Sequence, residues 1–315
     1  MSQRLGVQVS PRAPSFLLLN INDIFYNKFL YKYILKYKYK YKMSKIAFIF
    51  LIYNVINHEE LWHMFFSNID KGRYSIYIHY KYDERLDFFE EYKVQKNIPT
   101  KYADISIVKA QNFMLSEALK DQNNTHFIFL SGSCIPLKPF DYIYDNLEER
   151  YSYFHIANPE ECLPDCIEAL NYIDIKYLNK ASQWCILNRK HSELLVNNKE
   201  YMKWFKNAYA ADELCYITYL SYTYKETFYE EIKATSYNSP PELATTFANW
   251  EGMDYKYVTD KELKNYIHIT QAELIHLLKS PCFFGRKFKP ISAHSINKDF
   301  YLNYVVKNIK DKNFY

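Results

Sequence analysis

The chain has 315 residues, 49% of them hydrophobic, which is enough to bury the core of one large domain or two modest ones. No apolar run approaches the roughly 20 residues that a membrane-spanning helix needs. Residues 1–42 hold 8 Lys/Arg and 1 Asp, and the rest of the chain holds 32 Lys/Arg and 35 acidic residues, so the net charge of +4 comes from the beginning of the chain. Because binding along phosphates needs clustered positive charge, a nucleic-acid groove in the rest of the chain is disfavoured.

Residues 1–42 form a basic, low-complexity tail, and residues 43–315 are predicted to form one folded domain. The tail contains the apolar run PRAPSFLLLN, which is too short for an ordinary secretory signal, and the Tyr/Lys repeat YKYILKYKYKYK. Two interpretations stay open. The tail contacts an anionic membrane surface peripherally, or it is an upstream extension without a structural role.

An alternation of strands and helices is predicted from the start of the domain. Residues 45–53 and 74–80 are apolar enough to be buried strands, and Asn57 can cap a helix between them. The buried face of that helix is expected to carry Leu61, Trp62, Phe65 and Phe66. Residues 105–108 predict a short strand, followed by a helix that extends to Ala118. The β-α-β order indicates a parallel sheet with right-handed crossovers.

Residues 125–146 are the most informative segment. The apolar run at 127–130 predicts a strand covered on both faces. Small residues then supply free backbone amides at the carboxyl end of this strand, where open α/β sheets bind ligands; they are Ser131, Gly132, Ser133 and Cys134. Gly132 is one of only 5 glycines; a need for positive φ or close backbone approach would explain its presence, and an ordinary surface turn is the alternative. A helix is predicted from near Phe140, after two prolines.

The second half of the domain continues the α/β pattern. Strands are predicted at residues 151–156 and 184–187, with an irregular region at 158–180 between them. Helices are predicted from near Arg189, from Asp212 and after a capping box at Thr270. The six cysteines lack the spacing of a metal site, and most are expected to be buried thiols, although Cys162 and Cys166 are close enough to pair.

Asp212 and Glu213 are candidate functional carboxylates. They stand in the first turn of a predicted helix, where the helix dipole favours negative charge. A carboxylate at such a junction can accept a proton from an attacking hydroxyl, with Asp212 as the cap and Glu213 as the base. The alternative is that both are ordinary first-turn residues.

Arg286 and Lys287 form the second candidate cluster. Two adjacent cations beside Gly285, between apolar pairs, can bind a diphosphate. The alternative is a solvated basic turn between aromatic residues of the core.

A third group suits a sugar. Ser182, Gln183 and Trp184 combine hydrogen-bonding groups with one flat apolar face, and Trp250 in NWEG has a similar setting. For both tryptophans a purely structural position is the alternative.

In this order the segments resemble the core-2/I-branching glycosyltransferase family, which includes peptide xylosyltransferases. The resemblance covers about residues 44–290 and is carried by KIAFIFLIYNVINHEELW, IYIHYK, FIFLSGSCIPLKPFDYIYDNL, KASQWCILNRKHSELL, AADELCYIT, ANWEG and FFGRKF. It implies a GT-A-like Rossmann-type α/β domain with a mixed, mostly parallel sheet flanked by helices. It also implies transfer of a sugar from a nucleotide donor with inversion.

The resemblance assigns roles to several residues. The family's general base carries over onto Glu213 and its diphosphate-binding lysine onto Lys287, with Arg286 as a helper. His79 and the turn at 131–134 would lie near the nucleotide and the sugar. The family works without a metal, and no two aspartates here stand two positions apart, so the Asp-x-Asp cation motif is absent. No metal and no cofactor besides the UDP-sugar donor are therefore expected.

Some residues depart from the family pattern. Ala181 replaces a frequent glycine, Lys81 stands where an acidic residue is common, and Lys264 is the only nearby candidate for an upstream arginine. These differences bear on the identity of the donor more than on the fold.

The expected function is inverting, metal-independent transfer of a sugar, N-acetylglucosamine or xylose, from a UDP-sugar to a glycan or glycoprotein hydroxyl. One alternative is a catalytically inactive protein that binds sugar nucleotides or glycans on the same scaffold. Another alternative is that residues 1–42 are the functional part of the chain and anchor it to a membrane or a nucleic acid. Relatives are usually Golgi membrane proteins, whereas no spanning segment is visible in this sequence, so a soluble or peripherally attached form is expected.

Overall fold

The computed structural model describes residues 44–157, 166–236, 245–248, 250–251 and 262–306. Strands of three to eight residues form its main sheet. Their bounds are β1 Lys45–Ile52, β2 Tyr74–Tyr80, β3 Asn124–Ser131, β5 Ser152–Ile156, β6 Ile186–Asn188 and β7 Ile232–Ser236. A smaller sheet contains β4 Ile135–Pro136, β8 Thr246–Ala248 and β11 Phe284–Arg286, and a two-stranded one contains β9 Trp250–Glu251 and β10 Glu262–Leu263.

The main sheet has the strand order β2-β1-β3-β6-β5-β7. The pairs β2–β1, β1–β3 and β5–β7 are parallel, and only β6 runs against its neighbours on both sides. The expected mixed, mostly parallel sheet of a GT-A-like α/β domain is therefore confirmed. The β-α-β unit at the start of the domain places β1 and β2 side by side, as their sequence order predicts.

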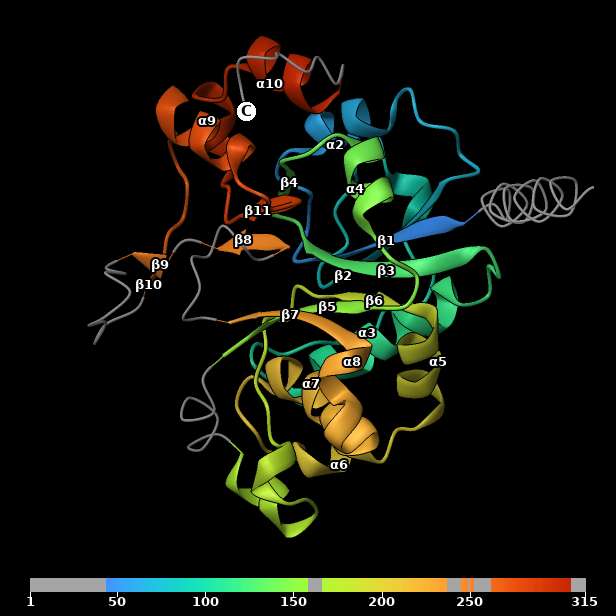
Figure 1. The fold of residues 1–315 in the computed structure, drawn as a ribbon. Helices are drawn as coiled ribbons and strands as arrows, with labels where there is room; N and C mark the ends of the chain where they lie inside the picture. The colour runs from blue at the N-terminus through green and yellow to red at the C-terminus, as the bar shows by residue number, and fades with distance from the viewer. Residues whose placement is uncertain (1–43, 158–165, 237–244, 249, 252–261, 307–315) are drawn as a thin grey trace, which may run out of the picture. The chain divides into compact units, whose positions relative to one another are not determined.

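Helices cover both faces of the sheet (Figure 1). One layer contains α2 Glu59–Phe66, α4 Phe140–Asn146, α9 Gln271–Lys279 and α10 Lys298–Val305. The other contains α3 Ile105–Ala118, α5 Arg189–Asn197, α6 Tyr201–Trp204, α7 Ala211–Tyr224 and α8 Phe228–Glu231. None of the helices in the described residues has the length and apolar character needed to cross a bilayer.

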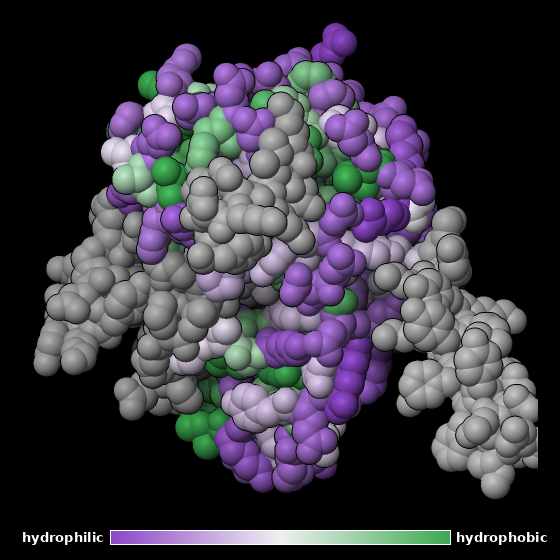
Figure 2. Space-filling view, turned by 45° about the horizontal axis from the view of Figure 1, so that its top comes forward, coloured by the Kyte–Doolittle hydropathy of each residue, from purple (hydrophilic) through white to green (hydrophobic). Residues whose placement is uncertain are grey.

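Each face of the sheet has its own hydrophobic core. Along β1, Phe48 and Phe50 pack into the core with α2 and α4, and Ala47 and Ile49 pack into the core with α3 and α7. This alternation follows from the two-residue period of a strand. All eight residues of β3 are buried, which confirms the prediction of a strand covered on both faces. Figure 2 shows mainly polar residues over the described surface of one face, with apolar residues in small scattered groups.

Two local predictions are wrong. Residues 105–108 are the first turn of α3 rather than a strand, because the Asp104 side chain caps the helix by accepting from the Ser106 amide at 2.8 Å. Asn57 does not cap α2, since the N-cap position is His58. The amide group of Asn57 instead donates to the Phe288 carbonyl at 2.7 Å, a contact between segments far apart in the sequence.

The other predicted boundaries agree with the structure within a few residues. The helix near Phe140, the helix at the Asp212 pair and the capping box at Thr270 are confirmed. The predicted strand at 184–187 is displaced toward its end, because β6 begins at Ile186.

The turn after β3 explains the position of Gly132. A Cβ atom at Gly132 would lie 2.4 Å from the Val55 carbonyl oxygen, far closer than atoms pack. The Gly132 carbonyl also accepts from the Asn57 amide at 2.7 Å, so the turn and the loop after β1 are held together. Close backbone approach, one of the reasons considered for this glycine, is the observed one.

Replacing Gly132 with Ala is expected to lower the free energy of unfolding by about 1–3 kcal/mol, because the backbone of one loop must move to admit the methyl group. The melting temperature should fall by roughly 2–4 °C for each kcal/mol in a domain of this size. Thermal unfolding followed by circular dichroism measures this change. A Gly72→Ala variant serves as the comparison, and equal melting temperatures for Gly132→Ala and the wild type would contradict the packing argument.

Candidate functional site

A cavity of about 830 Å³ opens at the carboxyl edge of the main sheet. The ends of β1, β2 and β3 supply Ile52, His79 and Ser131 to its wall. Its other walls come from the start of α3, the loop before β6, the start of α7 and the residues after β11. Parallel α/β sheets bind ligands at this edge because the loops that follow the strands diverge there.

Glu213 stands on the α7 side of this cavity. Its carboxylate lies 3.6 Å from the ammonium group of Lys180, and both side chains are partly exposed to the cavity. The backbone around it is fixed, because its amide donates to the Ala210 carbonyl and its carbonyl accepts from the Ala181 amide. Glu213 is thus a carboxylate with a nearby positive charge and access to a ligand.

Asp212 lines the same wall but has a different environment. It lies in the first turn of α7, whose N-cap is Ala210, so the predicted capping role of its side chain is wrong. Burial, and secondly the negative charge of Glu213, raise its pKa from 3.8 to about 7. One carboxylate oxygen of Asp212 is buried with no hydrogen-bond partner in the described part of the chain. The charged form of this residue therefore destabilises the fold.

An Asp212→Asn variant is expected to be more stable than the wild type at pH 8, by about 4 kcal/mol. The folded protein holds this proton up to about pH 7, whereas the unfolded chain releases it near pH 3.8. The destabilisation by Asp212 therefore grows between those pH values, and the gain of the variant should be almost absent at pH 4. Urea unfolding at the two pH values measures it. An equal gain at both would show that ionisation is not the cause.

The opposite wall is basic. Arg286, Lys287 and Lys289 all line the cavity. Burial, followed by the positive charges of Arg286 and Lys289, lowers the pKa of Lys287. The guanidinium group of Arg286 lies over the ring of Trp184, 4.5 Å from its centre. This stacking connects two of the predicted segments, and both of its residues line the cavity.

Contacts from several elements hold the backbone of residues 286–289, which carries the three cations. The Phe288 amide donates to the Ser133 carbonyl at 2.9 Å, and the Phe288 carbonyl accepts from the side chain of Asn57. Tyr266 exchanges two backbone hydrogen bonds with Lys287 and Lys289, both at 2.9 Å. The cations consequently stand on a rigid backbone that is anchored to the turn after β3.

The residues at the ends of β2 and β3 use several of their polar groups to hold the neighbouring backbone in place. His79 is buried, which lowers its pKa, and its Nε2 atom lies 3.0 Å from the Ile98 carbonyl oxygen. The expectation of free amides in the turn after β3 is wrong for three of its residues. The Ser131 amide donates to the Cys134 sulfur, the Ser133 amide to the Ser131 hydroxyl, and the Cys134 amide to the Ser131 carbonyl. The turn closes on itself because its side chains are short enough to reach its own backbone.

Most of the predicted site residues line one cavity; they are Glu213, Asp212, Arg286, Lys287, His79, Ser131, Gly132, Ser133, Gln183 and Trp184. Ser182 does not line it, because its hydroxyl accepts from the Trp184 amide and its own amide donates to the His155 carbonyl. The side chain of Trp250 lies outside the described residues. Lys264 is paired with Glu273 at 3.2 Å and is not a lining residue, so its nomination is not supported.

Sequence reasoning missed other residues of the cavity. Lys180 begins the segment KASQWCILNRKHSELL, which carries part of the family resemblance, but nothing in the sequence indicates its contact with Glu213. Tyr102 and Tyr209 also line the cavity. Aromatic residues are so common in this chain that their presence in a segment does not mark it as part of a binding site. Of the cysteines, Cys134, Cys185 and Cys215 are buried thiols, while Cys162 lies outside the described residues. No cluster of three or more potential metal ligands occurs in the part of the chain that the structure describes.

Fold and cavity define an α/β protein with a ligand site at the carboxyl edge of its sheet, lined by the carboxylates Asp212 and Glu213 and by the cations Lys180, Arg286 and Lys287. The chain belongs to the core-2/I-branching enzyme family, whose family model matches residues 46–279. This confirms the resemblance seen in the sequence.

One curated relative is the glycosyltransferase BC10 of Oryza sativa subsp. japonica, which is 29% identical over 171 residues. The match covers 52% of this chain and 43% of the relative, so the chain spans less than half of the length of that protein. Among solved structures, the apo form of the bifunctional glycosyltransferase WbbM is similar at a TM-score of 0.42 and 11% identity, covering 78% of this chain and 47% of that one. A glycosyltransferase involved in the glycosylation of the major capsid of PBCV-1 gives a TM-score of 0.34 and 10% identity, with coverages of 76% and 93%.

Proposed function

We propose that this protein transfers a sugar from a UDP-sugar to a hydroxyl group of a glycan or glycoprotein, with inversion at the anomeric carbon and without a metal ion. N-acetylglucosamine and xylose are the proposed donor sugars, in keeping with the family. One observation carries the proposal: Glu213 and the cations Arg286 and Lys287 line the same cavity from opposite layers of the fold.

The proposed reaction is a single displacement. The acceptor oxygen forms a bond to the anomeric carbon while the bond from that carbon to the diphosphate oxygen breaks. The acceptor proton passes to Glu213, and the electron pair of the broken bond leaves with UDP. Attack from the face opposite the leaving group inverts the configuration.

Positive side chains support the departure of UDP in this proposal. Negative charge develops on the diphosphate as the bond breaks, and cations that already stand in place stabilise it without reorganisation. Arg286 is held by stacking on Trp184, and Lys287 by the hydrogen bonds of its backbone. These fixed cations would perform the role that a divalent ion has in other sugar-nucleotide enzymes.

The size and position of the cavity also favour a nucleotide sugar. Its volume of about 830 Å³ lies within the usual range for ligands of this size. His79 and the turn at residues 131–133 are proposed to lie beside the nucleotide and the donor sugar, since they form the strand-end wall.

A catalytically silent binding protein is the second candidate. The unfavourable burial of Asp212 beside Glu213 speaks against it, because a carboxylate whose charged form destabilises the fold has no evident use in a protein that only binds an anionic nucleotide.

The test measures UDP release by the purified full chain with UDP-N-acetylglucosamine or UDP-xylose, in the presence of EDTA, with and without acceptor glycosides. The proposal expects turnover with one of the donors, and proton NMR of the product should show inverted configuration. Tight binding of UDP without turnover would favour the silent binder. Turnover that EDTA abolishes, or retained configuration, would contradict the corresponding part of the mechanism.

A further inference from the structure

A pair of tyrosines stands at the rim of the cavity on the side of Glu213. Tyr102 and Tyr209 both line the cavity, yet 81% and 57% of their surfaces are exposed. Their ring centres lie 6.4 Å apart, and the rings meet edge to face. Large aromatic side chains left open to solvent beside a cavity indicate a binding surface, because burial elsewhere would stabilise the fold.

The backbone beneath both rings is held in a costly conformation. Ala103 and Ala210 directly follow the two tyrosines, and each has a φ of 53°. Only one further non-glycine residue of the described chain, Lys225, has positive φ. The Ala210 amide donates to the Ala103 carbonyl at 2.9 Å, so the two loops are joined at this point. A positive φ costs a non-glycine residue about 1–3 kcal/mol, and residues in this conformation are concentrated at functional sites.

The same loop connects the rings with the catalytic wall. The Ala210 carbonyl accepts from the Glu213 amide at 2.9 Å, which fixes the loop against the start of α7. The pKa of Tyr102 is raised, first by its hydrogen bond with Tyr209 and also by the negative charges of Glu213 and Asp212. The tyrosine pair is therefore within electrostatic reach of both carboxylates.

We infer that Tyr102 and Tyr209 form the acceptor subsite and that they bind a sugar ring of an acceptor glycan. This inference rests on the proposed transfer reaction. A pyranose packs its C–H face against an aromatic ring while its hydroxyls need donors and acceptors. The tyrosines supply the first requirement, and Lys180 and Glu213 supply the second. A hydroxyl of the stacked sugar is then directed toward the base.

A sugar fits this rim better than a peptide does. Extended peptides are recognised by open strand edges and by pockets for alternate side chains. The rim presents two phenol rings with Lys101 and Lys180 beside them, on loops rather than on a strand. These groups can bind the many hydroxyls of a sugar.

The test uses the full chain with saturating UDP and a panel of methyl glycosides: β-galactoside, N-acetyl-β-glucosaminide, N-acetyl-α-galactosaminide, α-mannoside and β-xyloside. Saturation-transfer NMR identifies the glycosides that bind, and titration gives their Kd values. We expect at least one to bind and Tyr102→Ala or Tyr209→Ala to raise its Kd by about tenfold or more. The Kd of UDP should be unchanged.

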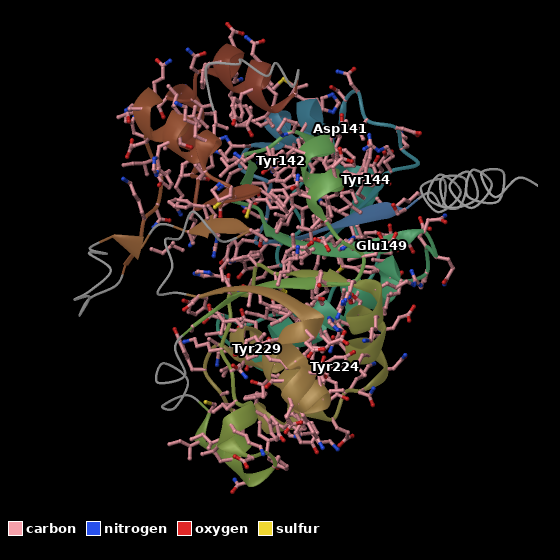
Figure 3. The ribbon with its side chains drawn as sticks, viewed as in Figure 1. Asp141, Tyr142, Tyr144, Glu149, Tyr224 and Tyr229 are labelled. Carbon is pink, nitrogen blue, oxygen red and sulfur yellow. The ribbon has the colours of Figure 1, made fainter. Side chains whose placement is uncertain are left out.

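Tyr229→Ala is the matched control. Tyr229, which is labelled in Figure 3, is 67% exposed on α8 and does not line the cavity. Glycoside binding that both rim variants leave unchanged would overturn the inference, and so would binding of a serine-containing peptide but of no glycoside. Absence of both UDP binding and donor turnover in the wild type would instead refute the proposed function.

Discussion

Glu213→Gln is expected to lower kcat for sugar transfer by roughly 10²- to 10⁴-fold, the contribution of a positioned general base. Glutamine keeps the shape of the side chain but cannot take the acceptor proton. The Kd of UDP should change little, because the diphosphate is proposed to contact the cations on the opposite wall. Steady-state kinetics gives kcat, and isothermal titration with UDP gives the Kd.

Glu149→Gln is the control for this experiment. Glu149 is an exposed carboxylate that lies outside the cavity and is labelled in Figure 3. It should keep wild-type kcat and the wild-type melting temperature. If Glu213→Gln retained transfer within about tenfold of wild type while properly folded, another group would have to accept the proton.

Lys287→Met is expected to raise the Kd of UDP by about 10- to 100-fold, the loss of one charge-assisted interaction. Transfer should fall further, by about 10²- to 10³-fold in kcat, because the leaving group gains negative charge in the transition state. Methionine preserves the apolar stem, so the fold should be retained. Titration with UDP and steady-state kinetics measure the two effects separately.

Two comparison variants sharpen the second prediction. Lys287→Arg keeps the charge and should restore a large part of UDP binding. Lys199→Met removes an exposed lysine outside the cavity and should have no effect. The idea fails if Lys287→Met binds UDP as tightly as wild type at both low and high salt, since a direct ionic contact weakens with ionic strength.

Much of the architecture could be predicted because the local patterns were strong. The apolar run of β3, the strand at 74–80 and the capping box of α9 each depend on residues close together in the sequence. The failures at Asn57 and at residues 105–108 have different origins. A long-range contact with the Phe288 carbonyl engages the Asn57 side chain, whereas α3 begins at Ile105 because the neighbouring Asp104 side chain caps it.

The sequence also indicated which kinds of side chain stand at the candidate site, but not which other residues each of them contacts. Glu213 and Lys287 were singled out as a carboxylate and a cation, whereas their shared cavity depends on how β11 pairs with β4 and β8. The contact of Glu213 with Lys180 and the stacking of Arg286 on Trp184 join segments that no spacing relates.

The sequence by itself determined the α/β class and the family, and it indicated which side chains to propose as reactive groups, because strand and helix periodicity and short motifs depend on neighbouring residues. Only the tertiary structure decided that Asp212 has a raised pKa, that Gly132 faces a carbonyl, and that Tyr102 and Tyr209 form one rim. Burial, charge proximity and close approach depend on the path of the chain in three dimensions. Local patterns specify the elements of that path but not the distances between them.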